Sequence, residues 1–239
     1  MDLTEKSTAD GVRHPWERYR FDFYKEILTS AFDGTRISVL DVGAGDGWLA
    51  HSLRAAWDGQ LDIVLWDSGY DEELVDQVGA SCVKCQPTQT FDLVLMLDVA
   101  EHVSDDLGFL RDVVQRNLAV YGRLLFSVPS YMWLWTTHDE RLRHKRRYSP
   151  KQARSLLERA GLRVLRSGGL FPMLLLVRTL QMVRERILKT PVPGLDTAPL
   201  GALAMSIEIF MELDNKIASR ASKMALDIPG ISWWALCAR

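Results

Sequence analysis

The sequence predicts an α/β fold, in which a doubly wound and mostly parallel sheet is covered by helices on both faces. Two observations carry this prediction. Short apolar runs alternate with helical patterns over the first half of the chain, as they do when crossover helices join parallel strands. The first apolar run also ends in a turn with three glycines, Gly43, Gly45 and Gly47, where a strand would pass into a helix.

Length and composition agree with one globular domain. The chain has 239 residues, of which 47% are hydrophobic and 25% are charged, and such a chain can bury a sizeable core. We therefore interpret residues 1–239 as a single domain.

The predicted elements follow one another in a regular order. After a flexible segment at 1–13, the aromatic and charged stretch 14–33 predicts a helix with Pro15 in its first turn. Apolar runs then predict strands, and amphipathic spacing between them predicts helices. The predicted strands are 37–42, 62–66, 81–85, 91–97 and 123–128, and the predicted helices are 47–57, 71–78 and 105–118.

The pattern changes after the fifth strand. Residues 131–148 predict an aromatic and basic loop, and Ser149 with Pro150 opens a helix that Gly161 ends. A sixth strand at 162–166, long helices at 171–189 and 200–223, and a last strand at 232–238 complete the chain. The domain then consists of a core at 37–170, a two-helix insertion at 171–225 and a final strand region at 226–239.

Charge and cysteine usage exclude several classes of function. The net charge of -2 gives no general attraction to polyanions, so we expect no nucleic-acid partner. Cys82 and Cys85 form a lone C-x-x-C pair without a second pair, so we expect neither a disulfide framework nor a metal site. The polar start lacks the apolar core of a signal peptide, and no stretch approaches the roughly 18 apolar residues of a membrane span. These features predict a cytoplasmic protein.

The glycine turn at 41–47 is the most informative motif. A nicotinamide dinucleotide site uses G-x-G-x-x-G, whose glycines make room for pyrophosphate at a helix start. Here the spacing is G-x-G-x-G, Trp48 replaces the third glycine of that pattern, and Asp41 adds negative charge. The turn therefore disfavours a nicotinamide oxidoreductase and favours a ligand with an amino-acid end and no phosphate. Asp67 ends the next predicted strand, where an acid accepts hydrogen bonds from ribose hydroxyls.

These residues resemble class I S-adenosylmethionine-dependent methyltransferases. The turn looks like the [DE]-x-G-x-G-x-G motif of that superfamily, and FDLVLMLDVAEHVSDD resembles its fourth-strand region. The likeness continues through YGRLLFSVPSY, HDERLRHKRRYS and IPGISWWALCAR. The chain most resembles a bacterial subgroup that is similar to methyltransferase types 11 and 23. Members of this subgroup are often encoded near glycosyltransferase and polysaccharide genes, or are fused to glycosyltransferases.

The resemblance implies a Rossmann-like, seven-stranded sheet whose last strand is antiparallel. It also implies S-adenosylmethionine as the cofactor and S-adenosylhomocysteine as its product. Asp67 would bind the ribose, Gln86 would lie nearest the adenine, and Asp98 would lie near the methionine end. The full set of residues expected to contact the cofactor is Asp41, Gly43, Ala44, Gly45, Gly47, Asp67, Gln86 and Asp98.

Two groups of titratable residues are candidates for acid–base catalysis. Asp98, Glu101 and His102 directly follow the fourth strand, and His102 is either catalytic or a cap of the following helix. His138 lies beside Asp139 in the loop after the fifth strand, where an acceptor would arrive. We hypothesise that His138 deprotonates an acceptor hydroxyl while the Asp139 carboxylate orients its ring.

The same loop predicts the acceptor site. Aromatic residues flank a run of basic ones, a combination that suits a sugar or a lipid phosphate. The alternative is a solvated charged loop in which Arg147 forms a salt bridge into the core. The residues expected to bind the acceptor are Tyr131, Trp135, His144, Arg146, Arg147 and Tyr148.

The helical insertion has two interpretations. Its helices pack on each other or on a second copy of the chain in a homodimer. Alternatively, the helix at 171–189 forms a lid or lies on the inner membrane surface, with 174–177 in lipid. In the second case the cationic side chains that meet the headgroups are Arg178, Arg184 and Arg186.

We therefore predict a methyltransferase that methylates an oxygen of a small-molecule, sugar or lipid-linked acceptor by in-line displacement. A nucleic-acid substrate is disfavoured also because 98–101 reads Asp-Val-Ala-Glu and not N-P-P-[YF]. The alternative is a non-catalytic cofactor-binding or scaffold module that acts through its helical insertion.

Overall fold

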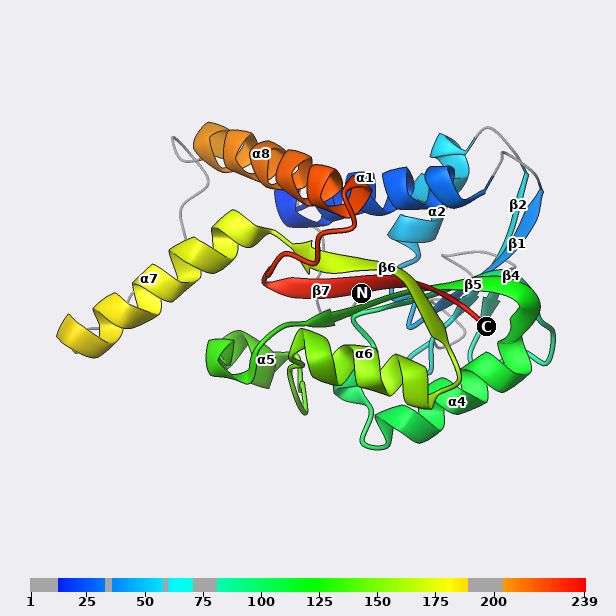
Figure 1. The fold of residues 1–239 in the computed structure, drawn as a ribbon. Coiled ribbons are helices and arrows are strands. Elements are labelled where there is room, and N and C mark those ends of the chain that lie inside the picture. The colour runs from blue at the N-terminus through cyan, green and yellow to red at the C-terminus, as the bar shows by residue number, and fades with distance from the viewer. Residues whose placement is uncertain (1–12, 33–35, 58–59, 71–80, 189–203) are drawn as a thin grey trace.

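A central sheet organises the computed structural model, which describes residues 13–32, 36–57, 60–70, 81–188 and 204–239. Within these residues seven strands pair in the order β3-β2-β1-β4-β5-β7-β6 (Figure 1). The predicted helix at 71–78 and the start of the predicted helix at 200–223 lie outside the described residues. The strands are β1 (Ile37–Val42), β2 (Leu61–Trp66), β3 (Cys82–Val83), β4 (Phe91–Leu97), β5 (Leu118–Pro129), β6 (Arg163–Leu170) and β7 (Ser232–Ala238).

Strand directions confirm the predicted seven-stranded sheet. The pairs β1–β2, β1–β4, β2–β3 and β4–β5 are parallel. Strand β7 runs antiparallel to both of its neighbours, β5 and β6. The chain leaves β1 toward β2 on one side and reaches β4 on the other, so the strand order reverses between β1 and β4. Open α/β sheets bind ligands at the carboxyl ends of the strands at such a point.

Helices cover both faces of the sheet, as the alternation of elements predicts. Two buried clusters fill the two interfaces, and side chains of β1 alternate between them: Ile37 and Val39 join one, Leu40 and Val42 the other. The first cluster includes α1 (Pro15–Ala31) and α2 (Trp48–Ala56), and the second includes α4 (Asp106–Asn117) and α6 (Pro150–Arg159). Figure 1 shows the two layers of helices on either side of the sheet.

The loop predicted at 131–148 contains more structure than expected. It holds a short 3₁₀ turn, η2 (Met132–Leu134), and a short helix, α5 (Thr137–Arg141). A capping box starts α5, because Thr136 and Asp139 each bond the backbone N–H of the other. The loop also closes on itself, since the Tyr148 N–H donates to the Pro129 carbonyl at 2.9 Å. This closure fixes where the charged side chains of the loop lie.

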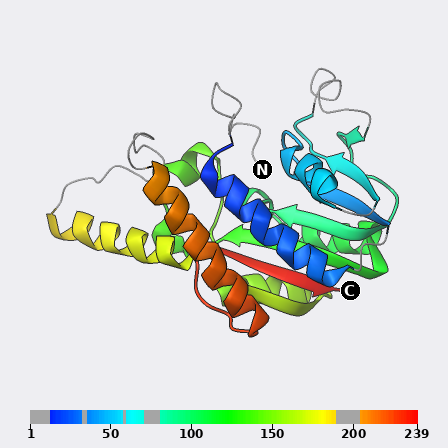
Figure 2. The same ribbon diagram turned by 90° about the horizontal axis from the view of Figure 1, so that it is seen from above.

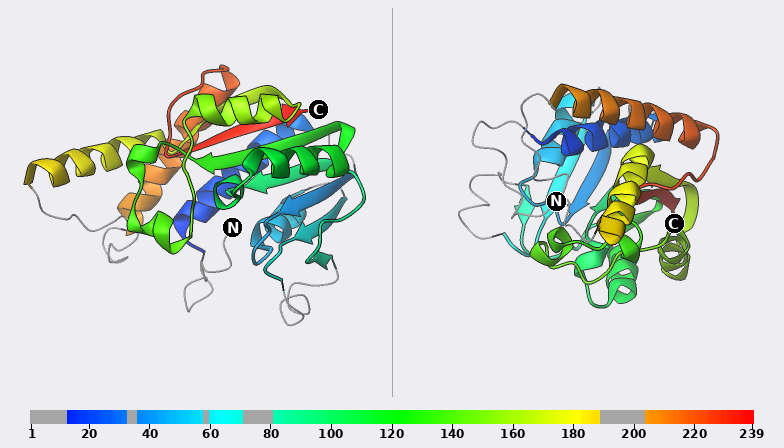
Figure 3. Two further views of the ribbon diagram at one scale, coloured as in Figure 1. Left: turned by 90° about the horizontal axis from the view of Figure 1, so that it is seen from below. Right: turned by 90° about the vertical axis from the view of Figure 1, so that its left-hand side faces the viewer.

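The insertion consists of α7 (Pro172–Leu188) and α8 (Ala204–Lys223), and the two helices have different surroundings. Helix α8 lies beside α1 (Figure 2), where Asn215 donates to the Tyr19 carbonyl at 2.6 Å. Helix α7 meets α8 at its first turn, where the Asp214 carboxylate accepts hydrogen bonds from the Met173 and Leu174 N–H groups. The rest of α7 extends away from the body (Figures 1 and 3). The described helices include none that is long and apolar enough to cross a membrane.

Candidate functional site

The glycine turn joins β1 to α2 at the carboxyl edge of the sheet. Gly43, Gly45 and Gly47 have φ values of 67°, 59° and 72°, which side chains with a Cβ rarely adopt. A Cβ at Gly43 would lie 2.7 Å from a methyl carbon of Val99, so the turn also packs closely against the segment that follows β4. The glycines therefore permit both the turn and this close approach.

Asp67 ties the end of β2 to the glycine turn. Its carboxylate accepts one hydrogen bond from the Gly45 N–H at 3.0 Å and another from the Gly69 N–H at 2.8 Å. The Gly43 N–H donates to the Trp66 carbonyl at 2.7 Å. The structure thus brings together the two features that the sequence singled out, the turn and the acid at the end of the second strand.

Asp41 makes the turn strongly acidic. Its carboxyl is buried at the end of β1, and burial raises its pKa to about 7, with Asp67 and Asp46 adding repulsion. Asp46 is paired with Arg13, whose guanidinium lies over the Trp48 ring. A buried carboxylate among other carboxylates favours a cationic ligand and opposes a phosphate.

Asp98 holds the end of β4 against α1. Its φ is 55°, in the left-handed region that a non-glycine residue rarely occupies. Its carboxylate forms an ion pair with Arg20 of α1 and accepts a hydrogen bond from the Ser127 hydroxyl at 3.0 Å. Burial opposes ionisation, but nearby positive charge, above all the Arg20 guanidinium, and the hydrogen bond from Ser127 together outweigh it and lower the pKa of Asp98. Asp98 therefore ties α1 to the carboxyl end of β4.

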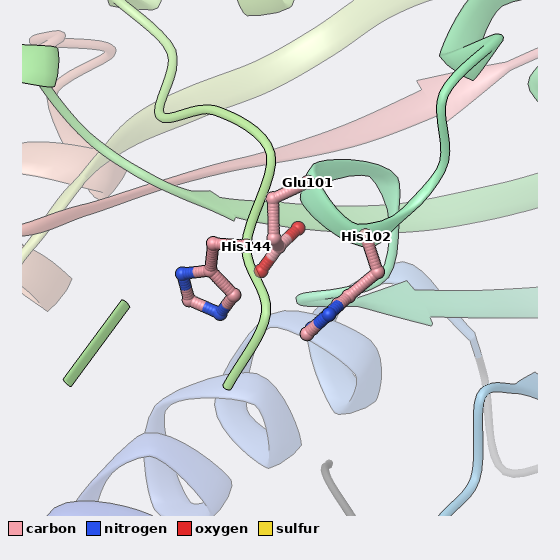
Figure 4. A group of neighbouring side chains, drawn as sticks. All are labelled: Glu101, His102 and His144. Carbon is pink, nitrogen blue, oxygen red and sulfur yellow. The ribbon is translucent and has the colours of Figure 1, made fainter. Parts of the chain in front are cut away.

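A group of one acid and two histidines lies directly beyond β4, and we call Glu101, His102 and His144 the acid–histidine cluster (Figure 4). Glu101 and His102 belong to η1 (Ala100–His102), and His144 comes from the loop after α5. The two imidazole rings meet edge to face, with centroids 4.7 Å apart. The Lys145 N–H donates to the Glu101 carbonyl at 2.8 Å, which holds the loop against η1.

Glu101 is the unusual member of the cluster. Its side chain is fully buried, and neither carboxylate oxygen has a hydrogen-bond partner among the described residues. Burial, followed by repulsion from Asp98, raises its pKa well above the ordinary value. An ionised and unpaired carboxylate in this position is costly, so the group is either protonated or compensated by a cation.

Asp139 orients His144 and not the adjacent His138, which corrects the pairing expected from the sequence. Its carboxylate lies 2.8 Å from His144 Nδ1 and accepts from Arg147 Nε at 2.7 Å and Nη2 at 3.0 Å. His138 Nδ1 instead lies 2.6 Å from an Arg141 nitrogen. The capping box explains the difference, because the Asp139 carboxylate turns back to accept from the Thr136 N–H and so lies toward the later part of the loop.

Other predicted acceptor residues have internal partners. Arg147 forms its salt bridge into the core, as the alternative interpretation of the loop expected. Arg146 pairs with Asp106 at 2.8 Å, and the Tyr148 hydroxyl donates to the same carboxylate at 2.7 Å. These three side chains bind other groups of the protein and hold the loop in place, so the structure does not support their expected contacts with the acceptor.

The predicted aromatic residues have a different environment. Tyr131 packs against Trp133 with ring centroids 5.7 Å apart, and Trp133 is 46% exposed. Trp135 is half-buried on the same segment. These rings remain candidates for acceptor contacts.

Gln86 also needs a correction. Its side-chain amide donates to the Asn117 side chain at 2.8 Å, and Asn117 immediately precedes β5. The amino ends of the parallel strands lie there, opposite to the glycine turn. The predicted contact of Gln86 with an adenine ring is therefore not supported.

The role of Glu101 is the one that was hardest to predict from the sequence. Its position after the fourth strand was visible, but it reads equally well as the start of a helix. His144 lies next to Glu101 only because the 131–148 loop folds back against η1. The spacing of residues along the sequence does not predict this fold.

Comparisons with known proteins agree with this geometry. A family model described as a methyltransferase domain matches residues 16–167. No sequence match was found among curated proteins. An S-adenosylmethionine-dependent methyltransferase from Mesorhizobium loti is 13% identical with a TM-score of 0.57, covering 92% of this chain and 100% of that one. A SAM-dependent methyltransferase from Archaeoglobus fulgidus is 16% identical with a TM-score of 0.52, covering 93% of this chain and 97% of that one. At these identities the two structures establish the shared fold.

Proposed function

The chain belongs to the methyltransferase domain family, and from this premise we propose that it transfers the methyl group of S-adenosylmethionine to an oxygen of a small-molecule, sugar or lipid-linked acceptor. The sulfonium donor is already activated. Alignment of the acceptor oxygen with the methyl carbon therefore supplies much of the rate acceleration.

The acidic turn supports the donor half of this proposal. S-adenosylmethionine carries a sulfonium and an ammonium group, and the buried Asp41 favours a cation where a pyrophosphate would be repelled. Asp67 has lone pairs beyond those used by Gly45 and Gly69, and ribose hydroxyls are suitable donors to them. Gly43, Ala44 and Gly47 would line the amino-acid part.

The acid–histidine cluster is the main support for the proposed position and chemistry of the acceptor. It follows β4 at the switch point of the sheet, and Val99 links it to the glycine turn through its contact with Gly43. An acceptor hydroxyl must lose its proton as its oxygen attacks the methyl carbon, and groups that assist this loss are gathered here. The exposed ring of Trp133 and the neighbouring Tyr131 suit the apolar face of a sugar or aromatic acceptor.

Helix α7 supports a membrane-associated acceptor. Leu176, Leu180 and Ile187 are 60%, 61% and 74% exposed and share one face of the helix. The helix also carries three arginines and one glutamate, which favours anionic headgroups. We propose that this face lies on a lipid surface and brings the enzyme to a lipid-linked acceptor.

Donor binding is the first test. Calorimetric titration with S-adenosylmethionine and with S-adenosylhomocysteine should give one site for each. Failure of both to bind would contradict the proposal and would favour a scaffold protein.

Acceptor chemistry is tested with pairs of compounds that carry a hydroxyl or an amine at the same position. We expect release of S-adenosylhomocysteine, and a methyl ether product, with the hydroxyl member of a pair. Turnover restricted to the amine members would contradict methylation at oxygen.

A further inference from the structure

We propose that the acid–histidine cluster binds a divalent transition-metal ion. Glu101, His102 and His144 each offer a ligand atom, and these atoms all lie within 4.8 Å of one another. Figure 4 shows the three side chains converging from η1 and from the loop after α5. This inference departs from the expectation of no metal site, which rested on the cysteines alone.

The donor set fits such an ion. Two imidazoles and one carboxylate are ligands that Zn²⁺, Mn²⁺ and Fe²⁺ accept, and three protein ligands leave coordination positions open for water or substrate. Ligand atoms of a tetrahedral zinc site lie about 3.3 Å apart, given metal–ligand distances near 2.0 Å. Closing the cluster on an ion therefore needs shifts of about 1 Å or less for each side chain, which rotation about side-chain bonds supplies.

The environment of Glu101 points to a bound cation. The side chain is 0% exposed, and both of its oxygens lack a hydrogen-bond partner within the described part of the chain. A protonated carboxyl would remove the charge but would still leave a buried O–H and a carbonyl oxygen unpaired. A metal ion bound at these oxygens removes both costs together.

The surroundings of His144 are those of a metal-binding histidine. Its Nδ1 is 2.8 Å from the Asp139 carboxylate, which also accepts hydrogen bonds from Arg147 at both oxygens. A carboxylate in this position accepts the proton of Nδ1 in a hydrogen bond, so Nε2 presents its lone pair as the ligand atom. Histidines that bind metals commonly donate their second ring N–H to a carboxylate in this way.

Asp98 is close to the cluster but has another role. Its carboxylate is engaged by Arg20 and Ser127, so the proposed ligands from the protein are the three members of the cluster. The remaining coordination positions are then available to an acceptor oxygen at the switch point of the sheet, where the donor is proposed to bind.

The catalytic consequence rests on the proposed function. An acceptor hydroxyl that coordinates the ion has a lower pKa and releases its proton to solvent more readily. Its oxygen attacks the methyl carbon, the carbon–sulfur bond breaks, and the electron pair of that bond stays on sulfur as neutral S-adenosylhomocysteine. The proton and the methyl group are both accounted for without an oxidant or reductant.

Metal binding is tested on the full chain, freed of any affinity tag and of metal by dialysis against a chelator. Calorimetric titrations with ZnCl₂ and MnCl₂ should show one saturable site for at least one of the two ions. Glu101→Gln, which keeps the side-chain shape, and His102→Gln should each weaken binding by at least about tenfold. His51→Gln removes an exposed imidazole of α2 and should bind as the wild type does.

Unchanged S-adenosylhomocysteine affinity checks that the variants are folded. The inference is overturned if the wild type shows no saturable site, or if Glu101→Gln and His102→Gln bind the ions as tightly as His51→Gln. Because this readout needs no acceptor, it separates the inference from the proposed function. A protein that binds the ion but transfers no methyl group contradicts only the proposed function, and turnover unaffected by chelation contradicts only the catalytic role of the ion.

Discussion

Single carboxylates with opposite environments define the two halves of the site. Asp41 lies among other acids, and burial raises its pKa to about 7. Asp139 lies between His144 and Arg147, and their hydrogen bonds hold its pKa well below the ordinary value despite burial. Among the described residues Asp41 forms no ion pair, whereas Asp139 is already paired with Arg147, so we assign Asp41 to ligand binding and Asp139 to the framework.

Replacing Asp41 by asparagine tests the first assignment. Asp41→Asn should weaken S-adenosylmethionine binding about tenfold or more, because a charge-assisted interaction is lost. In the wild type, affinity should fall as the pH drops below about 7, since protonation removes the charge that the ligand requires. Calorimetry between about pH 6 and about pH 8, on either side of the Asp41 pKa, measures both effects.

Asp62→Asn is the matched control for this change. Asp62 is an exposed acid of β2 that pairs with Arg36, and its replacement should leave the affinity and its pH dependence unchanged. The assignment of Asp41 fails if wild-type affinity stays constant over the same pH range.

Asp139 carries a prediction about stability. Asp139→Asn leaves the Arg147 guanidinium without its charged partner in a position where only 10% of the side chain is exposed. Breaking a buried pair of this kind costs about 3 kcal/mol of the free energy of unfolding. Asp112→Asn, which breaks the exposed pair with Arg116, should cost about 0.5 kcal/mol or less. Urea denaturation measures both values, and equal losses would contradict the structural role of Asp139.

The pH dependence of this contribution follows from the lowered pKa. An acid whose pKa is lower in the folded state stabilises the protein fully above its unfolded pKa, near 3.9 for aspartate. The stabilisation by Asp139 is therefore present at neutral pH and is lost as the pH falls below about 4. The stability difference between wild type and Asp139→Asn should shrink in that acid range.

At the scale of elements, the described part of α7 is anchored at its first turn and extends away from the rest of the fold. Asp214 of α8 anchors its first turn, while Leu176, Leu180 and Ile187 remain exposed. Burying such side chains in a lipid interface is favourable, and the arginines of α7 add attraction to anionic headgroups.

Vesicle binding tests this surface directly. The protein should cosediment with vesicles that contain phosphatidylglycerol, and the binding should weaken as salt is raised. A double variant, Leu180→Ser with Ile187→Ser, should lose most of this binding and keep its affinity for S-adenosylhomocysteine. Absence of cosedimentation at low salt would count against a lipid surface, and a dimer in light scattering that the same variant disrupts would identify a second copy as the occupant.

The elements themselves could be predicted where one local signal dominated. The largely apolar run of β4 and the left-handed Gly161 after α6 are examples, and the structure confirms both. Helix α5 was missed because its capping box, Thr136 and Asp139, is hidden in a dense run of charged residues. Strand β5 also begins at Leu118, before the predicted start, because Leu118 pairs with Phe91 across the sheet.

At the scale of the whole molecule, the sequence was enough to bring together the residues proposed to bind the donor, but not those proposed to bind the acceptor. The glycine turn and Asp67 lie at the ends of adjacent parallel strands, so the strand order alone brings them together. Glu101 and His144 meet only because the 131–148 loop folds back and bonds to η1. The sequence therefore located the titratable residues but paired Asp139 with the wrong histidine.

The central claim is that donor and acceptor meet between the glycine turn and the acid–histidine cluster. A crystal structure of the complex with S-adenosylhomocysteine measures this most directly. We expect the amino-acid part along Gly43–Gly47, the ribose hydroxyls within hydrogen-bond distance of Asp67, and the sulfur facing Glu101, His102 and His144. A ligand bound elsewhere, or a sulfur directed away from the cluster, would contradict the claim.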